Sequence, residues 1–150
     1  MGIEANMEKV SRRIEAACRA SGRDPKEVRL IGVSKTKPVE AMLSAYEAGL
    51  RDFGENYVQE VLEKAPELPE DLRLHFIGHL QTNKAAKLLP HICMLHSLDS
   101  LHLAEELEKQ LAKHPERGRL PVLLEVNIAG EATKFGFPPE EVLPAVGKIV

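Results

Sequence analysis

The sequence predicts an α/β protein built as a partial TIM (β/α)8 barrel, with about five parallel strands, their helices and a preceding N-terminal helix. Short apolar segments alternate with amphipathic ones along the chain, as they do in βα units. The G-x-G-x-x-G fingerprint of dinucleotide-binding sheets is absent after the first apolar segment, which favours a barrel over an open doubly wound sheet. Because a complete barrel takes roughly 250 residues, residues 1–150 are predicted to form a single, truncated barrel domain.

An amphipathic helix is predicted at the N-terminus. Its apolar residues recur at spacings of three and four, at Met7, Val10, Ile14 and Ala17. Ser21 and Gly22 end it, because glycine readily adopts the left-handed conformation that terminates helices. Asp24 then caps a short helical turn that begins with Pro25, a residue suited to the first helical position.

Four strand and helix pairs follow this turn, and the strand comes first in each. They are 29–35 with 39–48, 52–56 with 57–65, 74–79 with 80–89, and 94–98 with 99–113. A fifth strand, predicted over 122–129, leads through the segment GEATKFGFP into a last helix over 139–150. The strict alternation predicts parallel pairing rather than hairpins.

Composition narrows the classes of function. The 20 basic and 23 acidic residues leave a net charge of -3, without the basic excess expected of a nucleic-acid-binding protein. No apolar run approaches the ~20 residues that cross a bilayer, and we expect no contact with a membrane. Cys18 and Cys93 belong to no C-x-x-C pair and are interpreted as free thiols, which fits a protein of the reducing cytoplasm.

Polar residues stand at the C-terminal ends of the predicted strands. Lys35 shares one face of the first strand with Ile31 and Val33, by the two-residue period. The ends of the other four strands carry Asn56, His79, Ser97 and Asn127. Because the functional groups of a barrel gather at this end of its strands, the five polar side chains are predicted to converge on one mouth.

Lys35 has the most distinctive chemistry of this group. An amine among apolar neighbours is costly to protonate, which lowers its pKa and frees a lone pair to form a Schiff base with an aldehyde. The alternative is an ordinary lysine that extends past the strand into water. Lys37 is the local competitor, but it directly precedes Pro38 and falls in the N-cap region of the next helix, so Lys35 is preferred.

The histidines do not predict a metal site. His75 and His79 are four residues apart, a spacing that lets two ligands share a metal on a helix, but this segment is predicted as a strand. His91, Cys93 and His96 lack a paired ligand motif. We therefore expect no metal and interpret His79 as a polar residue of the mouth.

Five segments together resemble the pyridoxal phosphate homeostasis family. They are VSKTKP at 33–38, FGENYVQE at 53–60, HFIGHLQTNK at 75–84, HSLD at 96–99 and VNIAGEATKFG at 126–136. Each segment alone is a weak signal. Their common order and spacing, from residue 33 to residue 136, make the resemblance specific.

The resemblance implies a barrel similar to the N-terminal domain of bacterial alanine racemase, with pyridoxal 5'-phosphate (PLP) as the cofactor. The first lysine of VSKTKP, here Lys35, would form the Schiff base, and Asn56, His79, Ser97 and Asn127 would wall the cofactor mouth. The family continues through three further strands, whose motifs surround the phosphate and approach the pyridine nitrogen. Those motifs are absent from the 150 residues of this chain.

The resemblance also implies a non-catalytic carrier that buffers PLP in vitamin B6 and amino acid homeostasis, with PLP-dependent apo-enzymes as partners. The alternative is a PLP-dependent amino-acid racemase or lyase, since the cofactor itself is the electron sink for such reactions. A racemase also needs an acid or base opposite the cofactor. The only tyrosines, Tyr46 and Tyr57, fall in predicted helices, so the carrier is preferred.

Overall fold

Five parallel strands form one sheet in which each strand lies beside its neighbour in the sequence. The computed structural model describes residues 2–150. The strands are β1 (Ile31–Val33), β2 (Asp52–Glu55), β3 (Arg73–Phe76), β4 (Met94–Leu98) and β5 (Val122–Leu124). In the register of the first pairs, Asp52 lies opposite Ile31 on one side and Arg73 on the other. The C-terminal ends of all strands therefore lie along the same rim of the sheet.

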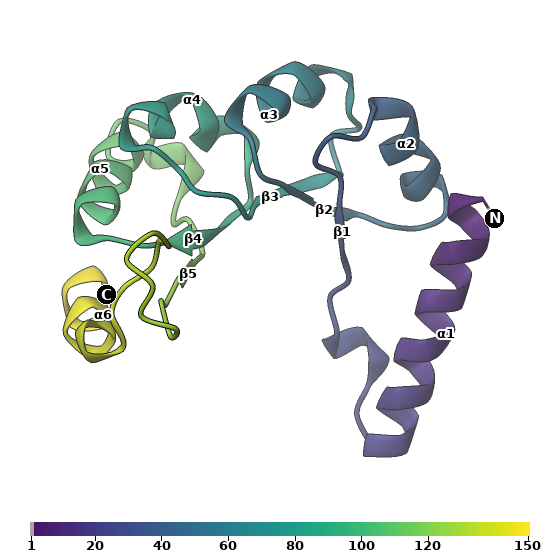
Figure 1. The fold of residues 1–150 in the computed structure, drawn as a ribbon. Coiled ribbons are helices and arrows are strands. Elements are labelled where there is room, and N and C mark those ends of the chain that lie inside the picture. Colours follow the sequence, from purple (N-terminus) through teal and green to yellow (C-terminus); the bar gives the residue numbers. More distant parts are fainter. Residues whose placement is uncertain (1) are drawn as a thin grey trace.

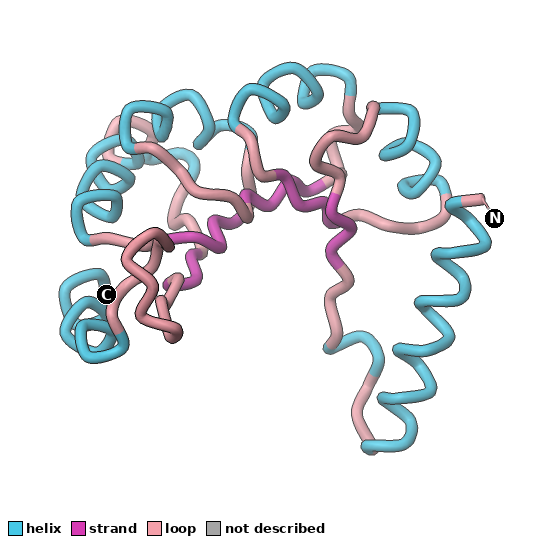
Figure 2. Tube along the Cα trace, viewed as in Figure 1, coloured by secondary structure: helices cyan, strands magenta, loops and turns pink. Residues whose placement is uncertain are grey.

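Helices cover one side of the sheet. They are α1 (Ile3–Ser21), α2 (Val39–Glu47), α3 (Val58–Lys64), α4 (Ala85–Leu88), α5 (Leu101–Leu111) and α6 (Val142–Ile149). In Figure 1 the sheet curves into an arch, with α2, α3, α4 and α5 along its convex side and α1 and α6 at its two ends. Figure 2 shows the strands on the inner side of this arch. The molecule has the helix-outside, strand-inside layering of a barrel segment.

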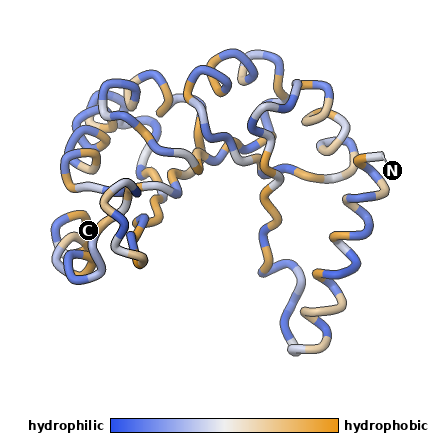
Figure 3. The backbone as a smooth tube through the Cα atoms, in the orientation of Figure 1, coloured by the Kyte–Doolittle hydropathy of each residue, from blue (hydrophilic) through white to orange (hydrophobic). Residues whose placement is uncertain are grey.

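The hydrophobic core lies between the sheet and the outer helices. Phe53, Phe76 and Leu95 extend from three neighbouring strands, and each is at most 2% exposed. Met42 of α2 and Val61 of α3 belong to the same buried cluster. Figure 3 shows hydrophobic stretches along the strands, whereas the helices alternate between hydrophobic and hydrophilic residues. Each such buried side chain contributes about 1.5–3 kcal/mol, so this layer fixes the positions of the strand ends.

The predicted architecture is confirmed: an α/β fold with five parallel strands, their helices and an N-terminal helix. α1 ends at Ser21, and Gly22 follows in the left-handed conformation, with φ of 68°. The Asp24 carboxylate accepts a hydrogen bond from the Lys26 N–H at the start of the short helical turn Pro25–Glu27. The sequence predicted the end of α1 and the start of this turn correctly because each signal acts within a few residues.

Four strands are shorter than predicted: β2 ends at Glu55 rather than at residue 56, β3 covers Arg73–Phe76 rather than 74–79, and the first and fifth strands differ most. The first covers Ile31–Val33 rather than 29–35, and the fifth ends at Leu124 rather than at residue 129. Beyond Leu124 the Asn127 N–H donates to the Phe137 carbonyl at 2.9 Å, so the backbone leaves the sheet and pairs with its own loop. A loop that supplies its own hydrogen-bond partners satisfies the backbone without continuing the strand.

The helix predicted over 80–89 is also shorter, because only α4 has α-helical hydrogen bonding. 3₁₀ turns flank it over Thr82–Lys84 and Leu89–His91. Pro90 lacks the N–H that would continue the helix. The last helix likewise starts at Val142, after a 3₁₀ turn over Pro139–Glu141.

Cys18 and Cys93 are both free thiols, as predicted, and Cys18 is buried. Across residues 2–150, no helix combines the length and the apolar character needed to cross a bilayer.

Candidate functional site

Lys35 lies just beyond the C-terminal end of β1. Ser34 to Lys37 form a turn in which the Lys37 N–H donates to the Ser34 carbonyl at 3.0 Å. Ile31 and Gly54 lie on the same face of the sheet, where an added Cβ on Gly54 would meet the Ile31 side chain at 3.4 Å. Lys35 is exposed, in the turn rather than in the strand, so the described residues do not enclose its amine in apolar surroundings.

The turn that carries Lys35 has an unusual backbone. Thr36 has φ of 61°, the only positive value among the non-glycine residues that the structure describes. This conformation costs a β-branched residue of the order of 1–2 kcal/mol. The Thr36 N–H donates to both carboxylate oxygens of Glu60, at 2.9 and 3.2 Å, and this charge-assisted contact offsets part of the cost.

Lys64, at the end of α3, binds the backbone of the turn through its ammonium group. Its Nζ donates to the Ser34 carbonyl at 3.0 Å, to Glu55 Oε1 at 2.8 Å and to Glu60 Oε2 at 2.6 Å. The Ser34 hydroxyl also donates to Glu55 Oε1, at 2.6 Å, and the Glu55 side chain is fully buried. Three segments, the first turn, the end of β2 and α3, are therefore joined through one ammonium group. We call these residues (Ser34, Thr36, Glu55, Glu60 and Lys64) the turn-bracing cluster.

The charges of the turn-bracing cluster stabilise one another. Burial lowers the pKa of Lys64, but hydrogen bonds from its ammonium to Glu55 and Glu60 outweigh burial, so the pKa of Lys64 is raised. Burial raises the pKa of Glu60, but hydrogen bonds from Lys64 and from the Thr36 N–H outweigh it, so the pKa of Glu60 is lowered. Lys64 is thus a cation with three acceptors and does not resemble a free amine nucleophile.

Asn56 follows β2, beside the backbone of Gly78. A Cβ on Gly78 would lie 2.2 Å from the Asn56 carbonyl oxygen, so no larger residue fits this contact without backbone movement. The Asn56 Oδ1 atom is buried and has no hydrogen-bond partner among the described residues. An amide oxygen in that state is an acceptor ready for a donor.

His79 follows β3 in the third segment of the rim. Its Nδ1 lies 3.0 Å from Oδ2 of Asp99, and because a carboxylate only accepts, Nδ1 is the donor. The ring of Phe135 stacks on the His79 ring, with the centroids 3.5 Å apart and the planes 7° apart. Asp99 and Phe135 therefore fix the orientation of the imidazole.

Ser97 and Asn127 make local hydrogen bonds. The Ser97 hydroxyl is buried and donates to the Gly78 carbonyl at 2.5 Å. The Asn127 Nδ2 donates to the Glu131 carbonyl at 2.8 Å, and its Oδ1 accepts from the Gly130 N–H at 3.1 Å. Both residues thus hold the backbone around the rim, and their direct contact with a ligand stays a prediction.

The rim brings Lys35, Asn56 and His79 to the ends of three consecutive strands, as the residue spacing predicted. Sequence reasoning missed the residues that position them: Glu55, Glu60, Lys64, Asp99 and Phe135. Glu60 and Lys64 do have the i, i+4 spacing of a helical ion pair, but this pattern is common on solvated helix faces. Nothing local in the sequence indicates that their partner is the turn after β1.

A second buried cluster lies at the opposite, N-terminal end of the strands. Asp52 accepts from Arg73 at 2.8 and 2.6 Å and lies 2.8 Å from His75 Nε2, and His75 Nδ1 lies 2.9 Å from His96 Nε2. Among the described residues, Asp52, His75 and Cys93 form a group whose potential metal-ligating atoms lie within 4.8 Å of one another. The Asp52 carboxylate already has a cationic partner in Arg73 and a second contact with His75, so these three side chains form a network around one ion pair.

The chain matches the family model described as alanine racemase, N-terminal domain, over residues 4–150. The chain belongs to the alanine racemase N-terminal domain family. A relative in Pseudomonas aeruginosa, named pyridoxal phosphate homeostasis protein, is 47% identical over 149 residues, which cover 99% of this chain and 64% of the relative. These matches confirm the resemblance that the five motifs indicated.

Two solved structures extend the comparison. A protein of Bifidobacterium adolescentis has a TM-score of 0.84 at 33% identity, covering 98% of this chain and 63% of that one. PipY of Synechococcus elongatus, solved with PLP bound, has a TM-score of 0.72 at 39% identity, covering 91% of this chain and 65% of that one. The chain therefore spans slightly less than two thirds of the length of these relatives.

Proposed function

We propose that residues 1–150 act as a single PLP-binding domain that carries or buffers the cofactor through a Schiff base on Lys35. The observation that carries this proposal is the turn after β1, where a buried charge cluster holds an exposed amine at the rim of the sheet. Two comparisons support it: the P. aeruginosa relative is named for PLP homeostasis, and PipY was solved with PLP bound.

The residues at the rim fit such a cofactor. PLP supplies an aldehyde that condenses with a primary amine and a conjugated ring that withdraws electrons from the attached group. Lys35 offers the amine in an exposed position, and Asn56 Oδ1, on the next strand end, is an acceptor without a partner among the described residues. His79, oriented by Asp99, presents a flat imidazole at the third strand end. Ser97 and Asn127 shape the remaining rim.

The turn-bracing cluster gives Lys35 its selectivity over other amines. Lys64 lies on the adjacent helix, but its ammonium is buried, cationic and bonded to three oxygens, so it cannot act as a nucleophile. Lys37 is exposed like Lys35 but directly precedes Pro38, the N-cap residue of α2. The cluster holds the backbone on both sides of Lys35, at Ser34 and at Thr36, and so presents that amine to the rim.

A non-catalytic carrier fits this chain better than a racemase or lyase. Racemisation needs an acid or base opposite the cofactor, and the chain has two tyrosines that could serve. The Tyr46 hydroxyl donates to Asp71 at 2.5 Å, and Tyr57 is the N-cap residue of α3. Tyr46 is thus engaged away from the rim, which leaves Tyr57, 54% exposed and directly after Asn56, as the tyrosine that a racemase could use. PLP-dependent apo-enzymes in the cytoplasm are the partners that such a carrier would serve.

The proposal is tested by adding PLP, reducing with borohydride and mapping the pyridoxyl group by mass spectrometry. We expect the label on Lys35, its complete loss in Lys35→Ala, and its retention in the matched control Lys37→Ala. A label that persists in Lys35→Ala, or that maps to Lys37 in the unmodified chain, would overturn the assignment. The carrier role itself fails if L-alanine is racemised faster than by free PLP and this rate is lost in Lys35→Ala.

A further inference from the structure

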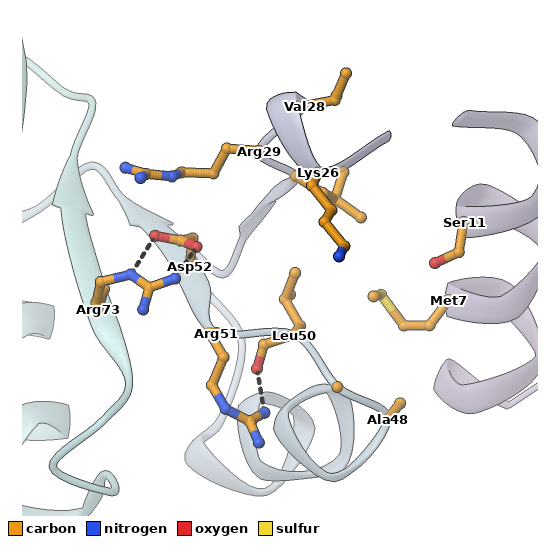
Figure 4. A pocket seen from close by; sticks show the side chains of 12 residues that line it. Met7, Ser11, Lys26, Val28, Arg29, Ala48, Leu50, Arg51, Asp52 and Arg73 are labelled. Carbon is orange, nitrogen blue, oxygen red and sulfur yellow. Dashed lines mark hydrogen bonds and ion pairs between the residues drawn. The ribbon is translucent and has the colours of Figure 1, made fainter. Parts of the chain in front are cut away.

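A cavity of about 450 Å³ lies between α1 and the N-terminal ends of β1 and β2. Figure 4 shows Met7 and Ser11 of α1 on one side of it, with Leu50 and the start of β2 on the other. Lys35 follows the C-terminal end of β1, whereas this cavity is reached from the residues before that strand. The cavity therefore has no part in the site proposed for PLP.

The lining of this cavity is strongly cationic. It contains four basic side chains, Lys26, Arg29, Arg51 and Arg73, and one acidic side chain, Asp52. The chain as a whole has a net charge of -3, so the local balance is opposite in sign to the global one. A cavity with such a lining attracts anions.

Two of the four cations are already engaged. Arg73 forms a two-point ion pair with Asp52, and Arg51 donates to Asp71 at 3.1 Å and to the carbonyl of Tyr46 at 2.8 Å. Lys26 and Arg29 are exposed, and neither side chain takes part in the ion pairs of the described residues. Their charge is the part of the lining that a ligand can use.

The cavity also has an apolar wall. Met7, Leu30 and Leu50 contribute to the lining, and Leu50 is 5% exposed. In Figure 4 the Lys26 amine extends into the space between Leu50 and α1, while the Arg29 guanidinium reaches over the ion pair of Asp52 and Arg73. The amine thus meets the apolar wall, and the guanidinium marks the adjacent edge of the cavity.

We propose that this cavity is a second, non-covalent site for a small phosphate monoester whose phosphate binds the Lys26 amine, while Arg29 adds positive charge at the adjacent edge. An ammonium group binds phosphate oxygens through charge-assisted hydrogen bonds, and a nearby guanidinium strengthens the attraction for the anion. The organic part of the ligand would lie against Met7 and Leu50, where it is removed from water. The site requires both features, so a phosphate with an apolar body should bind better than the bare anion.

The test uses two-dimensional NMR of the whole chain, titrated with phenyl phosphate, inorganic phosphate and phenol. We expect phenyl phosphate to shift the amides around Met7, Lys26 and Leu50, inorganic phosphate to bind at least fivefold more weakly, and phenol to cause no saturable shift. The double variant Lys26→Gln/Arg29→Gln should weaken phenyl phosphate binding at least tenfold, because it removes the charge-assisted contact of Lys26 and the neighbouring positive charge of Arg29. The control Lys87→Gln removes another exposed cation, from α4, and should change nothing.

Each outcome decides the proposal. Unchanged affinity in the double variant, shifts confined to residues outside the cavity, or equal binding of phenol would overturn it. Lys26 and Arg29 are exposed, so their replacement leaves the core intact, and the spectrum of the variant reports its fold directly. Lys35→Ala should keep the non-covalent site, which separates its failure from that of the PLP proposal.

Discussion

The two ends of β2 carry buried carboxylates with contrasting partners. At the C-terminal end of β2, here called the upper end, Glu55 is fully buried. It pairs with Lys64, whose side chain is 10% exposed. At the N-terminal end of β2, the lower end, the Asp52 side chain is 6% exposed. It pairs with Arg73, whose side chain is 47% exposed. The upper pair is thus removed from water on both sides, whereas the lower pair keeps one charge solvated.

The two clusters also differ in what they hold. The upper one binds backbone atoms of Ser34 and Thr36, so its geometry sets the turn that presents Lys35. The lower one joins side chains of neighbouring strands, from Asp52 through His75 to His96. A buried ion pair that holds a backbone loop positions a reactive group, while one that spans strands contributes to the register of the sheet.

Lys64→Met should have the largest effect, because it leaves the buried carboxylate of Glu55 without a cation. We expect a loss of about 3–5 kcal/mol in the free energy of unfolding, measured by urea denaturation. The double variant Glu55→Gln/Lys64→Met should recover much of this loss, since it removes both charges. The exposed pair of Arg12 and Glu8 provides the control, and Arg12→Gln should change stability by no more than about 0.5 kcal/mol. A similarly small loss of stability in Lys64→Met would show that the buried pair of Glu55 and Lys64 contributes no more than a surface pair.

Asp52→Asn should cost less, about 1–3 kcal/mol, because water can solvate the guanidinium of Arg73 that it leaves behind. The same denaturation measurement decides the order of the two variants. Labelling of Lys35 by PLP and borohydride should be unchanged in Asp52→Asn and reduced in Lys64→Met after correction for the folded fraction. The reverse pattern would mean that the lower cluster, not the upper one, positions Lys35.

Acid should act on the lower cluster through Asp52. Burial raises the pKa of Asp52, but hydrogen bonds from Arg73 and His75 outweigh it and lower the pKa from 3.8 to about 2. A carboxyl whose folded pKa is depressed adds stability above its unfolded pKa and loses it as the pH falls through the folded value. We expect about 2 kcal/mol to disappear between about pH 4 and pH 2. Asp52→Asn should flatten this part of the curve of unfolding free energy against pH.

Alkali should act through the upper cluster instead. The folded pKa of Lys64 is raised above 10.5, so its contribution is complete below that pH and is lost as the pH rises through the folded value. Urea denaturation above pH 10.5 should therefore show a falling limb in the unmodified chain that is weaker in Lys64→Met. An equal slope in both proteins would contradict this assignment.

Thr36→Gly should have the smallest effect, and a stabilising one of up to about 1 kcal/mol, because glycine tolerates φ of 61° without the β-branched penalty. Thr133→Gly is the matched control, since Thr133 is exposed and its φ is not positive. That control should be neutral or slightly destabilising by thermal denaturation. A destabilised Thr36→Gly would show that the Thr36 side chain, rather than its backbone, matters to the turn.

The class of fold was predictable because its signals are local and repeated. The alternation of apolar and amphipathic segments gave the order of strands and helices, and Asp24 and Gly22 marked the turn and the helix end. The predicted end of the fifth strand was wrong because the Asn127 N–H donates to the carbonyl of Phe137, ten residues along the chain. Such a pairing depends on how the loop closes, and the two-residue alternation of apolar side chains does not predict loop closure.

By itself the sequence determined that Lys35, Asn56 and His79 stand at the ends of successive strands, because strand periodicity and parallel pairing bring those positions to one rim. Only the tertiary structure decided that Lys35 lies in a turn braced by α3. Lys64 reaches Ser34 across 30 residues of chain, and Glu60 reaches Thr36 across 24. Periodicity specifies which face a residue occupies, whereas the partner of a buried charge is chosen by packing, since only burial makes an unpaired charge costly.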